Sequence, residues 1–178
     1  EPQDYYLMLQ SDNPKSADQN QSFMNRVPPT GPVIHLGTDS AINGSSTTMV
    51  AYSWHSVPGL QKFGFYNGNG SSSGPFIELG FRPAIVWVKR TDSTTDNWYI
   101  NDSTRDPFNV TGSSLKANLA RAEATTGASF SATWDILSNG FKLRDSGTGS
   151  NTSGVRYIYC AWAEAPSVNL YGDGANAR

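Results

Sequence analysis

The sequence predicts an all-β protein, an antiparallel β-sandwich of jelly-roll-like type that carries an extended N-terminal arm. Only 16% of the 178 residues are charged, and Gly, Ser, Thr and Asn fill the deficit. Aromatic residues make up 12% of the chain, and they favour pleated, half-buried strands, whereas strong helix formers are scarce. Short apolar segments also alternate with turn signals at the spacing typical of a sandwich or barrel.

Residues 1–30 are expected to form an extended polar arm. The arm has one apolar cluster, residues 5–9, which is followed by a polar stretch at residues 10–25. A segment of this composition orders only against another surface. We predict that a neighbouring copy holds the arm, and docking onto its own domain is the alternative. Residues 31–178 are expected to form the β-sandwich domain.

The apolar segments after residue 31 predict a series of strands. They lie at residues 33–36, 49–55, 62–66, 76–80, 84–89, 97–101, 129–136, 140–144 and 156–164. Residues 84–88 and 157–162 are apolar on both faces, which predicts central strands packed between two layers. Residues 115–124 have apolar positions at helical spacing, but the segment is short, so at most one or two helical turns are expected.

The clearest predicted hairpin lies within residues 133–144. Asn139-Gly140 supplies the positive φ angles that a tight turn requires. Phe141 and Leu143 alternate with basic residues, so one face of the second strand is expected to be buried and the other wet.

Charge and hydropathy exclude several classes of partner. A formal charge of −2 and an isoelectric point near 5.6 do not provide the basic surface of a nucleic-acid binder. The apolar runs are far shorter than the about 20 residues that cross a bilayer, so no membrane insertion is expected. Cys160 is the only cysteine, and a buried, inert thiol is expected. The lack of an initial Met predicts a processed start at Glu1.

No motif predicts an active site, so we expect no enzymatic activity, no cofactor and no metal ion. Residues 70–74 match the nucleophile elbow of serine hydrolases, but an elbow leads into a helix and here Pro75 leads into a predicted strand. His35 and His55 have no carboxylate or thiol at metal-ligand spacing. Residues 92–97 are rich in oxygen ligands but lack calcium-loop spacing, which favours a solvated hairpin tip.

One candidate surface contact comes from neighbouring aromatic and acidic residues. Trp98 and Tyr99 lie beside Asp96, and an aromatic face with polar neighbours is a common way to hold a sugar ring. The alternative, which we favour, is that Trp98 is a strand residue of the core.

Three stretches carry a family resemblance. They are Gly-Pro-Phe-Ile at residues 74–77 running through Gly-Phe-Arg-Pro-Ala-Ile-Val-Trp-Val-Lys-Arg at 80–90, Leu-Ser-Asn-Gly-Phe-Lys-Leu-Arg at 137–144, and Tyr-Ile-Tyr-Cys-Ala-Trp-Ala-Glu-Ala-Pro at 157–166. Together they resemble a module of marine and environmental bacteriophage virion proteins, which forms the C-terminal part of tail-fibre-like or appendage proteins. The likeness covers residues 49–178. It implies a place on a virion and carries over no catalytic or binding residue.

We therefore expect a structural surface module of a bacteriophage virion, a tail-fibre or appendage component that contacts the host surface on the extracellular phage particle. One alternative is a capsid decoration or head-fibre protein. Another is a carbohydrate-binding module of a secreted protein. The expected partners are other copies of the chain and neighbouring virion proteins, with a host surface glycan as a further candidate.

Overall fold

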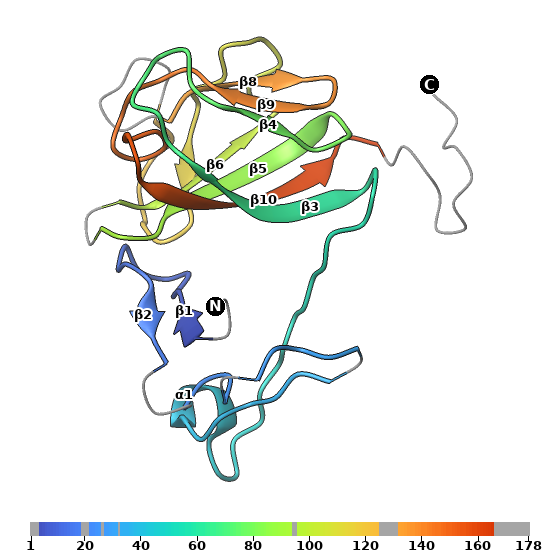
Figure 1. Cartoon of the computed structure of the whole chain (residues 1–178), viewed down its shortest axis with the longest axis vertical. Helices are drawn as coiled ribbons and strands as arrows, with labels where there is room; N and C mark the ends of the chain where they lie inside the picture. The colour runs from blue at the N-terminus through green and yellow to red at the C-terminus, as the bar shows by residue number, and fades with distance from the viewer. Residues whose placement is uncertain are drawn as a thin grey trace.

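The computed structural model describes residues 4–18, 22–25, 27–31, 33–93, 96–124 and 132–165. Its strands form antiparallel sheets, two of which lie face to face as the layers of a sandwich (Figure 1). The predicted all-β antiparallel fold is thus confirmed, while the jelly-roll connectivity stays a prediction.

The larger layer is a five-stranded sheet with the strand order β3-β10-β5-β6-β7. Its members are β3 (Gln61–Asn67), β10 (Arg156–Ala163), β5 (Pro83–Arg90), β6 (Trp98–Asp102) and β7 (Leu115–Lys116). The two strands that are apolar on both faces, β5 and β10, pair with each other in the interior of the sheet. Their central position is confirmed.

The smaller layer is a three-stranded sheet that covers one face of the larger one. It contains β4 (Phe76–Glu78), β9 (Gly140–Leu143) and β8 (Trp134–Leu137) in that order. Alternate residues of a strand point to the same side, so each strand of both layers sends every second side chain into the core between the sheets. The core residues include Trp134, Phe141 and Leu143 of the smaller sheet and Tyr66, Val86, Val88, Tyr157 and Tyr159 of the larger one.

The predicted hairpin of β8 and β9 is confirmed, but its turn works differently. Leu137 pairs with Gly140 across the two-residue loop, and neither Asn139 nor Gly140 takes a positive φ. A Cβ at Gly140 would overlap the carbonyl oxygen of Ile77 on β4. The glycine is therefore required by the close approach of a neighbouring strand.

Two loops at one end of the sandwich are joined by a buried amide. The two N–H groups of the Asn151 side chain face three acceptors, Asn69 Oδ1 at 3.0 Å and the Ser71 and Asp145 carbonyls at 2.7 Å, so at least one N–H is shared between two acceptors. Its own oxygen accepts from the Asn69 amide at 2.9 Å. One side chain that has no exposed surface thus links all four groups.

The described residues between 4 and 47 form a separate N-terminal lobe below the sandwich (Figure 1). The lobe contains the paired strands β1 (Tyr5–Tyr6) and β2 (Ser16–Ala17) and the short helix α1 (Ser40–Asn43). Buried Asp18 organises it, because its carboxylate accepts hydrogen bonds from the amides of Ser22, Phe23 and Met24 at 2.7, 3.1 and 3.0 Å.

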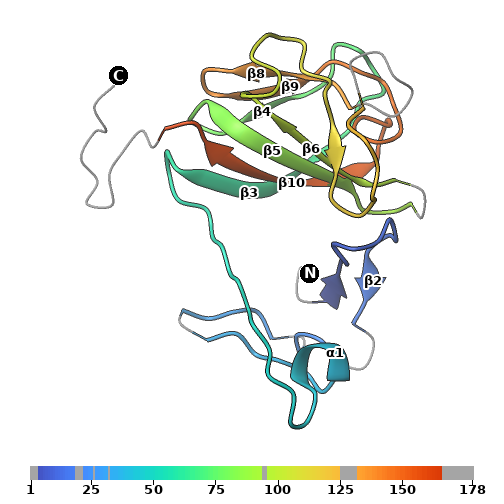
Figure 2. The same cartoon turned by 180° about the vertical axis from the view of Figure 1, so that it is seen from behind.

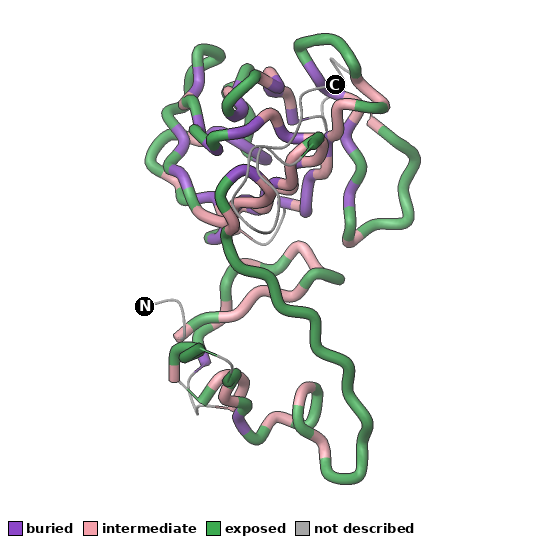
Figure 3. Tube along the Cα trace, turned by 90° about the vertical axis from the view of Figure 1, so that its right-hand side faces the viewer, coloured by how far each residue is buried: buried purple, intermediate pink, exposed green. Residues whose placement is uncertain are grey.

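An extended linker, residues 48–56, joins the lobe to β3 (Figures 1 and 2). All of its residues are exposed, and Figure 3 shows it as a continuous exposed segment. Within the described chain, no backbone-to-backbone hydrogen bond reaches these residues. Val50, Tyr52 and Trp54 nevertheless alternate as in a strand, and the rings of Tyr52 and Trp54 stack with centroids 6.1 Å apart.

Three expected elements differ from the structure. Residues 33–36 form only an isolated bridge between Thr30 and Val33, and residues 49–55 belong to the unpaired linker, so neither is a strand. Residues 115–124 begin with β7 instead of a helical turn, because Leu115 and Lys116 pair with β6. Residues 129–131, the start of another predicted strand, lie outside the described residues, as do residues 166–178.

Candidate functional site

The outer face of the five-stranded sheet is apolar, although the three-stranded layer covers only the opposite face. Phe63, Cys160 and Trp87 are cross-strand neighbours on β3, β10 and β5. Trp162 packs edge-on against both Phe63 and Trp87, with ring centroids 5.6 and 5.7 Å away. The apolar residues that point away from the core thus form a second aromatic surface.

The N-terminal lobe lies against this surface through three hydrogen bonds. The Lys15 amide donates to the Thr91 carbonyl at 2.9 Å, and the Trp98 indole N–H donates to the Met8 carbonyl at 3.1 Å. The Lys89 ammonium group donates to the Asp12 carbonyl at 3.2 Å. In this chain the arm therefore contacts its own sheet, which is the alternative to being held by a neighbouring copy.

A groove of about 620 Å³ remains open between the lobe and the sheet. Leu7 and Leu9 line it from the lobe, Trp54 from the linker, and Trp87, Trp98 and Trp162 from the sheet. All of its walls are apolar or aromatic apart from the thiol of Cys160. The indole N–H of Trp87 has no acceptor among the described residues.

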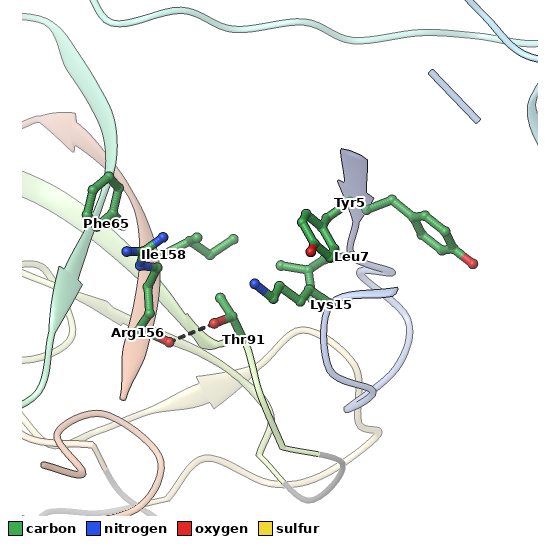
Figure 4. A pocket seen from close by; sticks show the side chains of 8 residues that line it. Tyr5, Leu7, Lys15, Phe65, Thr91, Arg156 and Ile158 are labelled. Atoms are coloured by element: carbon green, nitrogen blue, oxygen red, sulfur yellow. Dashed lines mark hydrogen bonds between the residues drawn. The ribbon is translucent and has the colours of Figure 1, made fainter. Parts of the chain in front are cut away.

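A second pocket of about 600 Å³ adjoins the groove at β1 (Figure 4). Lys15 lies over the ring of Tyr5 at 4.3 Å, and Arg156 lies over the ring of Phe65 at 4.5 Å. None of the described acidic side chains lines this pocket, and Leu7 borders both cavities. We call the two cavities together the lobe–sheet cleft, which has a basic, aromatic end and an apolar end.

A buried cation lies under the lobe beside the cleft. Lys89 belongs to the outer face of β5 and has no exposed surface. Burial lowers the pKa of its ammonium group, while the nearby carboxylates of Asp96 and Asp12 oppose that change. Its ammonium group also donates to the Arg90 carbonyl at 2.7 Å. The lobe thus supplies both a carbonyl acceptor and a negative charge to a cation of the sheet.

The thiol in the groove has little nucleophilic character. Burial raises the pKa of Cys160 to about 11, so near neutral pH the sulfur carries its proton and is not the reactive thiolate. Cys160 therefore contributes apolar surface to the groove. The residue is half-buried and not fully buried as expected, because it faces the open groove.

The predicted contact residues do not come together on the surface. Exposed fractions are 8% for Trp98, 7% for Tyr99 and 4% for Asp96. Neighbours on a strand face opposite sides, so Tyr99 enters the core while Trp98 lines the cleft beneath Met8. Burial raises the pKa of Tyr99 to about 12. Asp96 forms an ion pair with Arg90 at 3.3 Å. Of the three, Trp98 is the one that borders the lobe–sheet cleft.

A family model described as a domain of unknown function, DUF7483, matches residues 1–166. The chain belongs to the DUF7483 family. Comparison with curated proteins and with solved structures finds no match. Because the matched residues include both the lobe and the sandwich, both walls of the lobe–sheet cleft are part of the DUF7483 domain.

Metal sites, membrane-spanning helices and nucleophile elbows each have a recognisable local structure. Among the described residues, no group of three or more His, Cys, Asp and Glu side chains could hold a metal ion. Over the same residues, no helix is long and apolar enough to cross a membrane. Ser72, the central serine of the elbow-like motif, is exposed in the loop that leads into strand β4. A nucleophile elbow would lead into a helix.

Most of the cleft was not identified from the sequence of this DUF7483 chain. Its walls come from residues as far apart as Leu7, Trp54 and Trp162. The available signal was the two-faced apolar pattern of residues 84–88 and 157–162, which predicted a second covering layer. In the structure the lobe takes the place of that layer and covers the sheet incompletely.

Proposed function

We propose that this DUF7483 chain is a structural surface module of a bacteriophage virion, a tail-fibre or appendage component that contacts the host surface. The observation that carries the proposal is the lobe–sheet cleft, an open aromatic site beside the sandwich core. The resemblance of residues 49–178 to tail-fibre-like proteins supplies the setting.

The basic end of the cleft suits a host surface glycan. Tyr5 and Phe65 have exposed fractions of 43% and 60%, so each ring offers apolar surface to a sugar ring beside the cation that lies over it. Lys15 and Arg156 would attract carboxylate or phosphate groups of an acidic polysaccharide, and among the described residues no carboxylate lines the pocket to repel them. We therefore propose acidic surface glycans as the ligands.

Labelling of intact particles tests the virion assignment. Antibody raised against this chain, followed by gold labelling and electron microscopy of phage that carry it, should mark the tail appendages. Gold on the head would instead support the capsid decoration alternative. If purified particles carry no label, and the chain is found only in the fraction that can be washed away from them, the virion role is refuted.

Glycan binding by the full chain tests the contact itself. On an array of acidic and neutral glycans, Arg156→Gln should weaken binding to acidic glycans about fivefold or more, because a charge-assisted contact is lost. The hydrogen bonds from Thr91 reach the Arg156 carbonyl, so the substitution leaves them in place.

Lys142→Gln on β9 is the matched control, because it removes a positive charge from the other sheet and should leave binding unchanged. Equal binding of acidic glycans by the unsubstituted chain, Arg156→Gln and Lys142→Gln would exclude the pocket as the glycan site. Strong glycan binding without any label on virions would favour the carbohydrate-binding module of a secreted protein.

A further inference from the structure

We infer that the N-terminal lobe is exchanged between copies of the chain, so that the lobe of one copy lies on the five-stranded sheet of another. The partner is thus a second copy of this chain. The inference goes beyond the proposed function, because chains can exchange lobes whether or not they belong to a virion.

The linker is the first observation that supports exchange. Val50, Tyr52 and Trp54 have exposed fractions of 75%, 77% and 59%, although large apolar side chains gain free energy when they leave water. The backbone of residues 48–56 is extended and makes no backbone-to-backbone hydrogen bond with the rest of the described chain. Exposed strand-like segments of this kind pair readily with another chain.

The interface between lobe and sheet is the second observation. Its hydrogen bonds run from Lys15 to Thr91, from Trp98 to Met8 and from Lys89 to Asp12, and none of them involves the linker. Rotation of the linker can therefore bring the same lobe surface to the same sheet surface of a second copy. Exchange of an identical element preserves every contact of the closed form, which makes it a low-cost route to an oligomer.

The charges of the lobe and of the outer sheet face are complementary, which makes the lobe the partner of this face. Described residues 4–18 carry three aspartates and one lysine, and the sheet places the buried cation Lys89 beneath them. The carboxylate of Asp12 acts on Lys89 in the direction that favours its charged form. A lobe from any copy satisfies this cation equally well.

Exchange also accounts for the apolar stripe of the linker. When two copies exchange lobes, both linkers run between the two sandwiches and lie close to each other. Val50 and Tyr52 of one linker can then pack against the linker of the second copy, and the unpaired backbone groups gain partners. In the closed single chain Val50 and Tyr52 stay largely exposed, although the Tyr52 ring stacks on Trp54.

Disulfide trapping in the full chain tests the inference. The backbones of Lys15 and Thr91 are joined by a hydrogen bond of 2.9 Å, so cysteines substituted at these positions stand on backbones in direct contact, as a disulfide requires. Two differently tagged chains are co-expressed on a Cys160→Ser background, one with Lys15→Cys and the other with Thr91→Cys. Non-reducing gels after mild oxidation should show a covalent dimer that contains both tags. A Lys15→Cys chain paired with Ser138→Cys, an exposed position in the β8–β9 turn, is the control and should give no product.

The double variant Lys15→Cys/Thr91→Cys makes the result decisive. Exchange predicts covalent dimers or larger species from this single chain. Its appearance only as a cross-linked monomer, together with no mixed-tag product, would overturn the inference even if the chain oligomerises by another surface. Since neither outcome depends on particle labelling or glycan binding, failure here leaves the proposed function standing.

Discussion

Asn151 shows how much one buried amide contributes to the loops of this fold. Asn151→Asp would place a carboxylate oxygen against three oxygen acceptors that now receive hydrogen bonds. We expect the free energy of unfolding to fall by about 2–4 kcal/mol, as for other broken buried networks. Urea denaturation followed by circular dichroism measures the change.

Asn139→Asp makes the same chemical change at an exposed turn residue and serves as the control. Its effect should stay within about 0.5 kcal/mol. Similar decreases in the free energy of unfolding for the two variants would show that the Asn151 hydrogen bonds do not stabilise the loops more than an exposed amide does.

We expect the stability of the N-terminal lobe around Asp18 to depend on pH. Burial alone would raise its pKa, but hydrogen bonds from the amides of Phe23, Met24 and Ser22 outweigh that effect and lower it. A carboxyl whose pKa is lower when folded than when unfolded adds stability above the unfolded value of about 3.9. That stability is lost as pH falls through the folded value.

Hydrogen exchange checks this expectation. After correction for intrinsic rates, the amides of Ser22, Phe23 and Met24 should lose protection between pH 5 and pH 2.5, while β5 in the core keeps its protection. Asp18→Asn should remove the change with pH. Constant protection of the three amides in the native chain would contradict the proposed role of Asp18.

At the scale of elements, the two faces of the central strands differ in tolerance to charge. Val86 on β5 is fully buried in the core, so Val86→Asp leaves an unpaired buried carboxylate and should prevent folding. Ile158 on β10 lies on the outer face beside Lys15 and Arg156, and Ile158→Asp should cost less than about 2 kcal/mol.

Soluble yield and thermal unfolding compare the two variants. From the sequence alone we expect either substitution to prevent folding, because residues 84–88 and 157–162 both predict strands covered on two faces. In the structure Val86 faces the core and Ile158 faces the outer side of the sheet, so the two substitutions should differ in effect. Equal loss of folding in both variants would mean that the outer face is covered as completely as the core.

The strands with alternating or two-faced apolar patterns could be predicted from the sequence. β5, β10, β8 and β9 follow from residue periodicity because burial of one or both faces dictates it. The segments at residues 33–36 and 49–55 have similar local composition, yet they do not form strands. A strand requires a hydrogen-bonded neighbour, and local sequence does not reveal whether the fold provides one.

The candidate site was harder to predict for the same reason. Trp98 was identified because it stands next to polar residues, and it does border the cleft. Trp54, Trp87 and Trp162 meet only through the register of distant strands and the path of the linker. Nothing in the local sequence distinguishes an aromatic residue that faces the core from one that faces the cleft.

For the whole molecule, we predict that the chain has no serine hydrolase activity. Ser72 is exposed on a loop that enters a strand, so it lacks the strand-to-helix geometry that activates an elbow serine. A fluorophosphonate probe should fail to label the native chain, and Ser72→Ala should change neither labelling nor folding. Specific labelling that disappears in Ser72→Ala would overturn the non-enzymatic interpretation.

The distribution of tryptophans gives the molecule a built-in optical reporter. The chain has five tryptophans, of which Trp54, Trp87, Trp98 and Trp162 line the groove while Trp134 is enclosed in the core. In a Trp134→Phe variant, ultraviolet emission would come from the groove alone. A red shift in mild denaturant would then record water entering as the lobe leaves the sheet, and a blue shift after removal of the denaturant would record its return, with no dye attached.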